Sequence, residues 1–299
     1  MANCTSSAWG AAGVLRPRPF LSGEGFVRKG SVPRGLPCLS LLLFLFLALP
    51  ASPALGSGEP PLVVGAVAPH HNVAGALIDR LYERIREQIP HPARVILIGP
   101  DHFMRARQNI VFSAADWRTP SGLLRADAEG ASSLKGAALR QDGVPRRDHG
   151  ITEHIPRVRK FFGDVPVLPL VVKSCATDLQ VLRVRRALEA LLRERGGVVI
   201  LSMDLSHYKP RAESDAEDER TLAALCAFRL DELNGLDVDC PRGARLLLTL
   251  LQSLGAVRSE LLERSNSADF RFLEKRKRRI SSQTTTRCLI IALANASMS

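Results

Sequence analysis

The sequence has little of what marks several large protein classes. It holds only six cysteines in 299 residues and no CxxC pair. These numbers argue against a disulfide scaffold, a zinc ribbon and a thioredoxin-like pair. With 22 glycines, 19 prolines and 45% hydrophobic residues, the chain is also unlike collagen, a coiled coil or a fully disordered protein. No internal repeat is visible, so one globular domain is expected.

The net charge of +11 could indicate nucleic acid or an anionic surface as a partner. Part of this excess lies in residues 1–57, which hold five basic residues against Glu24 alone. The run EKRKRR at 274–279 is typical of a solvated loop or an edge hairpin. A nucleic-acid contact is the alternative, but no interleaved aromatic residue or recognition motif accompanies the run. No nucleic-acid partner is therefore expected.

Residues 1–57 have the pattern of a targeting segment. An uncharged apolar run of eleven residues, LSLLLFLFLAL at 39–49, follows Arg28, Lys29 and Arg34 and precedes small residues at 51–57. This basic, apolar and cleavable order is that of a secretory signal, and the run is shorter than the roughly 20 residues of a spanning helix. We therefore expect export, or membrane attachment through this segment only. A cytoplasmic protein with a buried helix here is the alternative.

Residues 58–299 alternate apolar runs with amphipathic segments, as expected for one α/β domain. Because the strands are apolar along their whole length, the sheet should be buried on both faces. The expected architecture is a largely parallel or mixed sheet with helices on both faces. The expected strands are 62–69, 94–98, 109–113, 165–172, 198–203 and 284–294, and the expected helices are 73–88, 148–162, 177–195, 216–230 and 242–254.

Three of these strands lead directly into histidine. The first is followed by His70 and His71, the second by His102, and the strand at 198–203 by His207. Ligands of open α/β sheets bind beyond the carboxyl ends of the strands, so these side chains should share one cleft. Imidazole is the commonest protein ligand of transition metals. The set therefore favours a metal site over the alternative that each is an ordinary core or loop residue.

Further polar residues fit the same cleft. Asp204 lies three residues before His207 and should either bind the metal or orient a ligating imidazole. His149 and His154 are candidates for substrate binding or proton transfer. Their alternative is an ordinary polar role at a helix start. His91, between two prolines, is expected to be a loop residue outside the site.

Cys240 directly precedes the expected helix at 242–254. The helix dipole and Arg242 should stabilise its thiolate, which would make it a nucleophile or a metal ligand. A small buried residue, or half of a disulfide, is the alternative. Cys175, Cys226 and Cys288 lie in apolar contexts typical of core residues, although two disulfides are arithmetically possible.

Five motifs, in order, resemble those of the Memo-like family, whose prokaryotic members are called AmmeMemoRadiSam system protein B. They are APHH at 68–71, ILIGPDH at 96–102, DHGITEHIP at 148–156, MDLSHY at 203–208 and CPRG at 240–243. The resemblance spans about residues 62–294. It implies a fold similar to the catalytic subunit of class III extradiol dioxygenases, which are non-haem iron enzymes. It also implies radical SAM and AMMECR-type system proteins as partners.

The resemblance implies metal ligands at His70, His102 and Cys240. It places Asp204, His207, His149 and His154 at other polar positions of the cleft. The chain departs from the family pattern at several points. His71 stands where a small residue is usual, Phe103 replaces a second histidine, and Asp148, Gly150 and Thr152 replace Glu, Ser and Glu. The acid lost at Thr152 removes a candidate proton carrier.

The expected function is that of a metal-dependent redox protein or a dioxygenase-like enzyme. Two imidazoles and a thiolate suit copper or iron better than magnesium or calcium. A thiolate in place of a carboxylate also argues against the ring opening of catechols. One alternative is a binding module that captures a peptide or a small anion in the same cleft. Another is a zinc hydrolase, because histidine and cysteine also suit zinc.

Overall fold

The computed structural model describes residues 61–256, 259–266 and 286–295, the last as backbone only. All of them belong to one unit, Glu59–Ser299. The targeting segment at 1–57 and the basic run at 274–279 lie outside the described residues, so export stays a prediction. Within the described part of the chain, no helix is long and apolar enough to cross a membrane.

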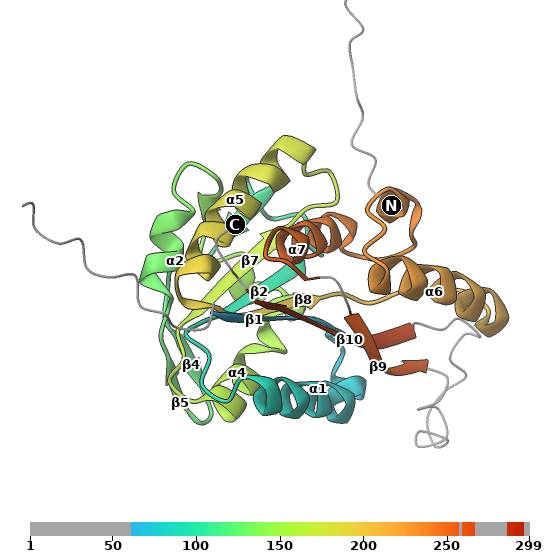
Figure 1. Cartoon of the computed structure of the whole chain (residues 1–299), viewed down its shortest axis with the longest axis horizontal. Helices are drawn as coiled ribbons and strands as arrows, with labels where there is room; N and C mark the ends of the chain where they lie inside the picture. The colour runs from blue at the N-terminus through green and yellow to red at the C-terminus, as the bar shows by residue number, and fades with distance from the viewer. Residues whose placement is uncertain (1–60, 257–258, 267–285, 296–299) are drawn as a thin grey trace, which may run out of the picture. The chain divides into compact units, whose positions relative to one another are not determined.

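An eight-stranded mixed sheet forms the centre of the domain, in the order β6-β3-β7-β2-β8-β1-β10-β9 (Figure 1). The four inner strands β7, β2, β8 and β1 are parallel, and β10 is antiparallel to both β1 and β9. This confirms the expected largely parallel or mixed sheet. The strands are β1 Leu62–Ala68, β2 Val95–Pro100, β3 Ile110–Phe112, β6 Leu139–Arg140, β7 Val167–Val172, β8 Gly197–Ser202, β9 Ser259–Asn266 and β10 Thr286–Asn295. A separate hairpin pairs β4 Trp117–Thr119 with β5 Gly122–Leu124.

Helices cover both faces of the sheet, as expected from its apolar strands. In Figure 1, α1 and α4 lie on one face and α5 and α7 on the other. The α-helices are α1 Gly75–Gln88, α2 Ala128–Ser133, α3 His149–Thr152, α4 Ile155–Phe162, α5 Asp178–Arg195, α6 Arg211–Cys226 and α7 Pro241–Ser253. Short 3-10 helices are η1 Asn72–Ala74, η2 Pro145–Arg147 and η3 Glu232–Gly235.

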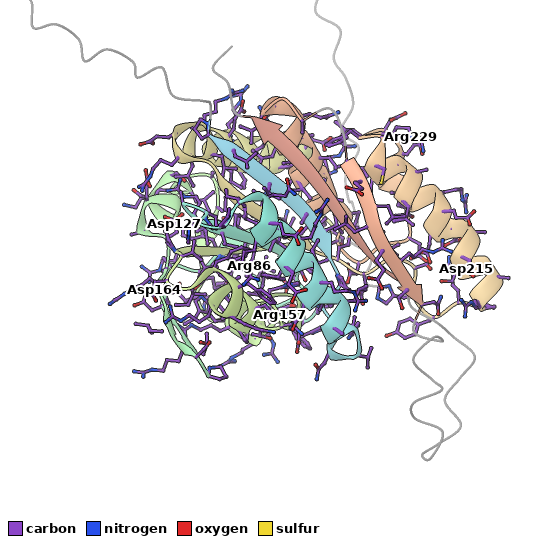
Figure 2. All side chains as sticks on the ribbon, turned by 60° about the horizontal axis from the view of Figure 1, so that its bottom comes forward. Arg86, Asp127, Arg157, Asp164, Asp215 and Arg229 are labelled. Atoms are coloured by element: carbon purple, nitrogen blue, oxygen red, sulfur yellow. The ribbon has the colours of Figure 1, made fainter. Side chains whose placement is uncertain are left out.

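The inner strands divide their side chains between two cores, because successive residues of a strand point to opposite faces. In β1, Val63 belongs to the core under α5 and α7, and Val64 to the core under α1 and α4. The second core is closed at its rim by Arg157 of α4, whose Nε donates to Asp79 of α1 at 2.8 Å (Figure 2). The inner strands β1, β2, β7 and β8 are therefore buried on both faces, and the loops at their ends are where a site can form.

Two of the helices expected from the sequence differ clearly from the helices in the structure. The helix expected at 148–162 is two helices, α3 and α4. Pro156 lies in the first turn of α4, and its missing N–H prevents the bond to Thr152 that one continuous helix would require. The helix expected at 216–230 begins earlier, at Arg211, and ends at Cys226. The short elements β4, β5, α2 and β6, and the strand β9, were not expected.

Two glycines let α7 pack tightly on the sheet. A Cβ atom at Gly65 of β1 would lie 2.3 Å from Leu251 Cδ1. A Cβ atom at Gly243, in the first turn of α7, would lie 2.5 Å from Cys240 Sγ and 2.8 Å from Leu201 Cδ1. Such distances are too short for real atoms, so only glycine permits this approach. The start of α7, with Asp239 and Cys240 before it, is thereby fixed against the sheet.

Candidate metal centre

The carboxyl ends of β1, β2 and β8 bring the predicted histidines together. These three strands are neighbours in the parallel part of the sheet, so the loops that follow them meet at one edge. The ring centroids of His70 and His102 are 4.8 Å apart, and that of His149 lies 3.9 Å from His102. We call His70, His71, His102, His149 and His207 the histidine cluster.

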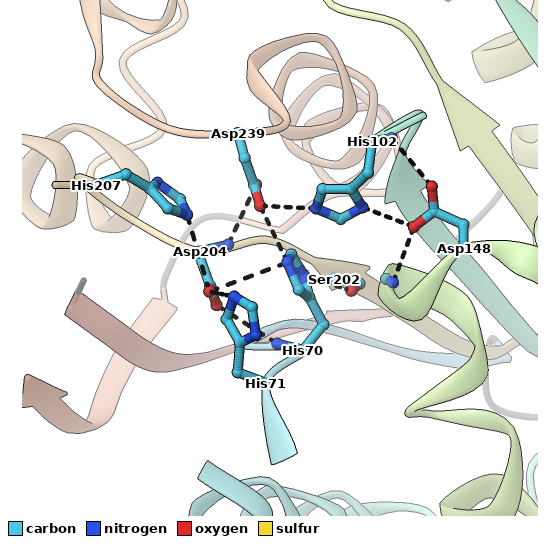
Figure 3. A network of polar contacts seen from close by, with 9 residues as sticks. His70, His71, His102, Asp148, Ser202, Asp204, His207 and Asp239 are labelled. Carbon is cyan, nitrogen blue, oxygen red and sulfur yellow. Dashed lines mark hydrogen bonds and ion pairs between the residues drawn. The ribbon is translucent and has the colours of Figure 1, made fainter. Parts of the chain in front are cut away.

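The first donor group consists of two imidazoles and a carboxylate (Figure 3). Asp239 Oδ2 lies 3.1 Å from His70 Nε2 and 3.6 Å from His102 Nε2. The three residues offer atoms that are all within 4.8 Å of one another. One ion held at about 2.0–2.2 Å by each donor needs donor separations of roughly 3–4 Å. The group therefore approaches the geometry of a metal site.

Each imidazole of this group is held through its other nitrogen. His70 Nδ1 lies 3.0 Å from Ser202 Oγ, and His102 Nδ1 lies 2.7 Å from Asp148 Oδ1. Asp148 also accepts the backbone N–H of His102 at 3.0 Å. Metal-binding histidines almost always have such a partner, which fixes the tautomer and the direction of the ring. Both Nε2 atoms consequently face Asp239.

Asp239 is the residue that the sequence patterns did not single out. Its Oδ1 accepts the backbone N–H of Asp204 at 3.2 Å, and its own N–H donates to the Asp204 carbonyl at 3.4 Å. Its Oδ2 is buried, has no hydrogen bond of regular geometry and points to the two imidazoles. The sequence signal that could have identified Asp239 is its position as an acidic residue directly before Cys240, at the start of a helix.

A second donor group lies beside the first (Figure 3). Asp204 Oδ2 is 3.1 Å from His71 Nε2 and 4.0 Å from His207 Nε2. The Asp204 side chain is fully buried, and its Oδ1 accepts the backbone N–H of His70 at 3.4 Å. The structure thus brings Asp204 and His207 next to His70, as the motif MDLSHY suggested.

Comparison with known proteins agrees with the motifs. A family model described as "Memo-like protein" matches residues 63–277. The chain belongs to the Memo-like family. MEMO1 family proteins from Nitrosopumilus maritimus (strain SCM1) and Methanococcoides burtonii are 23% and 28% identical over 219 and 222 residues. Each alignment covers 69% of this chain, and 78% and 81% of the relatives.

The fold is also found among solved structures. An uncharacterized protein from Escherichia coli K12 matches with a TM-score of 0.52 at 14% identity, over 77% of this chain and 99% of that chain. This likeness shows a shared fold.

Cys240 is the third ligand implied by the family resemblance. Among the described residues, no group of three donor atoms within 4.8 Å of one another includes it. Its side chain belongs to the core and is 1% exposed. The expected stabilised thiolate is wrong, because burial and the charge of Asp239 raise the pKa of the thiol. Arg242 donates instead to Asp178 at 2.6 Å. The carboxylate atom that faces both imidazoles is Oδ2 of Asp239, the residue before Cys240.

The other cysteines take no part in the donor groups of the described residues. Cys175 and Cys226 are half-buried, and no disulfide joins either of them to Cys240. Cys226 packs against the core, as expected. The side chain of Cys288 lies outside the described residues.

The two further candidates, His149 and His154, have different surroundings. His149 begins α3 and belongs to two donor groups, one with His70 and His71 and one with His102 and Asp148. His154 is fully buried beneath α1, where its Nδ1 lies 3.2 Å from the hydroxyl of Tyr82. It belongs to none of the donor groups found in the described residues. The structure therefore brings His149, and not His154, to the histidine cluster.

The remaining departures from the family pattern lie around the same cluster. Asp148 is the partner of His102 described above. Phe103 is 50% exposed, and its ring centroid lies 6.1 Å from that of His149, so it adds an apolar surface where the family has a ligand-type side chain. Thr152 ends α3 without adding a carboxylate. The chain thus keeps the two imidazoles of the family motifs, His70 and His102, and differs from the family in residues around them.

Carboxylates control the charge of the cluster. Burial acts to lower the pKa of His102, but hydrogen bonds with Asp148 and Asp239 outweigh it and raise the pKa to about 9. The pKa of His70 is also raised, because the contacts with Asp239 and Asp204 outweigh burial. By contrast, burial and then the charge of His102 lower the pKa of His149 to about 4. Protons on His70 and His102 balance the negative charge of the carboxylates. A metal cation can take the place of these protons.

Three buried atoms at the centre lack regular hydrogen bonds: His70 Nε2, Asp204 Oδ2 and Asp239 Oδ2. His70 Nε2 lies 3.9 Å from Asp204 Oδ2 and 3.1 Å from Asp239 Oδ2. A cation bound between these atoms would contact several of them at once, in place of the protons that balance the carboxylates. Nitrogen and oxygen donors of this kind fit a transition metal.

Proposed function

We propose that this chain binds Fe(II) through His70, His102 and Asp239 and supports redox or oxygen-dependent chemistry at that ion. The observation that carries the proposal is the convergence of two anchored Nε2 atoms on Asp239 Oδ2, at 3.1 and 3.6 Å. Two imidazoles and one carboxylate are the donor set of non-haem Fe(II) oxygenases. Held by these three residues, an iron ion would keep open coordination positions and would supply redox chemistry there.

The choice of iron follows from the carboxylate. The sequence favoured copper or iron because a soft thiolate was expected from Cys240. With Asp239 as the third donor, the harder oxygen favours iron over copper. The reason given above against ring opening of catechols also depended on the thiolate, so catechols become reasonable test substrates.

The surrounding residues have separate tasks in this proposal. Ser202 and Asp148 hold the two imidazoles in the orientation that binds the ion. His149, whose pKa is about 4, is uncharged at neutral pH and stacks on His102. It can accept a hydrogen bond from a substrate hydroxyl without adding positive charge. Phe103, exposed beside His149, offers an apolar contact for an aromatic substrate.

A zinc hydrolase is the second candidate, because two histidines and a carboxylate also form catalytic zinc sites. Its supporting observation is the same donor set. The two candidates differ in oxygen consumption, which only the iron protein supports. A binding module without chemistry would show neither oxygen uptake nor hydrolysis.

The test is anaerobic loading of the purified chain with Fe(II), followed by electron paramagnetic resonance of its nitric oxide adduct. Oxygen uptake is then measured with a reductant and with a panel of catechols. H102Q and D239N should lose the iron signal, whereas H91Q should keep it, because His91 is an exposed residue outside the cluster. The proposal is wrong if H102Q and D239N bind iron as well as H91Q, or if the loaded protein consumes no oxygen.

A further inference from the structure

His71 gives this chain an imidazole that the family pattern lacks, and it completes the second donor group. Asp204 Oδ2 lies 3.1 Å from His71 Nε2 and 4.0 Å from His207 Nε2. The donor atoms of the three residues are all within 4.8 Å of one another. Two nitrogens and one oxygen at these separations repeat the composition of the first group.

The acid of this group is positioned for a ligand. The side chain of Asp204 is fully buried, and its Oδ2 has no hydrogen bond of regular geometry. Its Oδ1 accepts the backbone N–H of His70, so the carboxylate cannot turn away without breaking that bond. The ion pairs of Asp204 within the described residues are all with imidazoles. A buried carboxylate of this kind needs a cation, either a protonated imidazole or a metal.

The two imidazoles of the group are accessible. The His71 side chain is 42% exposed and that of His207 is 22% exposed, whereas His70 is fully buried. The residue after His207, Tyr208, has a positive φ of 58°, a conformation uncommon for a residue with a side chain. This turn directly follows the histidine and holds it near the end of β8. An ion can therefore enter from solvent and meet a buried carboxylate.

We propose that His71, Asp204 and His207 bind a second transition-metal ion, beside the site formed by His70, His102 and Asp239. Two imidazoles and one carboxylate suit zinc, cobalt or iron rather than magnesium or calcium. The two sites are structurally linked, because His70 and His71 are consecutive and the N–H of Asp204 donates to Asp239 Oδ1. The inference goes beyond the proposed function and does not require the first site to be occupied.

The test counts metal ions per chain with Co(II) as the probe. Wild-type protein and single variants are dialysed to equilibrium against Co(II), and bound metal is measured by elemental analysis together with the visible spectrum. Wild type and the control H91Q should bind two ions. H71Q and H207Q should lose one ion and keep the spectrum of the first site. H102Q should lose one ion and keep the spectrum of the second.

The variants also separate this inference from the proposed function. If wild type binds one ion, and that ion is lost in H102Q but kept in H71Q and H207Q, the second site is overturned and the first site stands. If the one ion is kept in H102Q but lost in H71Q, the first site is overturned and the second site stands. Two ions that remain in both H71Q and H207Q overturn the ligand assignment, and no bound ion overturns both sites. Because His71 is exposed, H71Q is expected to fold, and thermal unfolding of each variant checks this.

Discussion

The two residues before α7 offer a sharp test, because the structure and the family motif assign the third ligand to different neighbours. In the structure, Asp239 Oδ2 faces both imidazoles at 3.1 and 3.6 Å, and Cys240 lies in the core. We expect Asp239→Asn to weaken Fe(II) binding strongly and Cys240→Ser to leave it nearly unchanged.

The size of the effect follows from the contacts. Changing a residue that only orients a ligand costs about 10–100-fold in metal affinity. Loss of a charged ligand should therefore cost at least about 100-fold, which is about 2.8 kcal/mol of binding free energy. Cys240→Ser should instead lower the free energy of unfolding by about 1–3 kcal/mol, because it places a hydroxyl in the core. An exposed cysteine replaced by serine would change the free energy of unfolding much less.

Iron affinity would be measured anaerobically by competition with a coloured Fe(II) chelator, and stability by urea unfolding of the metal-free protein. Asp237→Asn is the matched control, since Asp237 is a nearby acid paired with Lys209 at 2.9 Å. A C240S protein that loses iron affinity by about 100-fold, beside a D239N protein that keeps it, would show the assignment of Asp239 to be wrong and that of Cys240 to be right.

Three further predictions concern the surroundings of the site. Asp148→Asn should weaken Fe(II) binding by about 10–100-fold, because the 2.7 Å contact that orients His102 loses its charge; an unchanged affinity in the same chelator competition would contradict this role. Burial, with smaller effects of His70 and Arg157, lowers the pKa of His154 to about 3, so the unfolded chain binds a proton more readily than the folded one. The contribution of His154 to stability should accordingly be full above pH 6.5 and fall as the pH drops toward 3, by about 2 kcal/mol at pH 5. The other histidines titrate in both proteins, so urea unfolding should show a loss of stability from pH 7 to pH 5 that is about 2 kcal/mol larger in the wild type than in H154Q. Equal pH dependence in both proteins would refute it. Mass spectrometry of protein from its native host should find a mature N-terminus between about residues 51 and 58; a soluble chain that retains residues 1–57 would contradict export.

The parts of the site that follow strands could be predicted from sequence. The apolar runs that become β1, β2 and β8 end directly before His70, His102 and Asp204. Because parallel strands present their carboxyl ends at one edge, each of these residues could be assigned to that edge. The same reasoning could not distinguish His149 from His154, because both lie near the start of the expected helix and their spacing does not show that His154 is buried against Tyr82 of α1.

Sequence alone therefore predicted the α/β class and the histidines at the strand ends, since these depend on local patterns of apolar residues. The resemblance to the Memo-like family rested on five short motifs. Only the tertiary structure showed how Asp239 and Cys240 are placed relative to the two imidazoles. Asp239 Oδ2 faces the two imidazoles, whereas the side chain of the next residue, Cys240, lies in the core. This placement accompanies the close approach of α7 to the sheet at Gly65 and Gly243. That approach is a contact between segments far apart in the chain, and no spacing of residues within one segment encodes it.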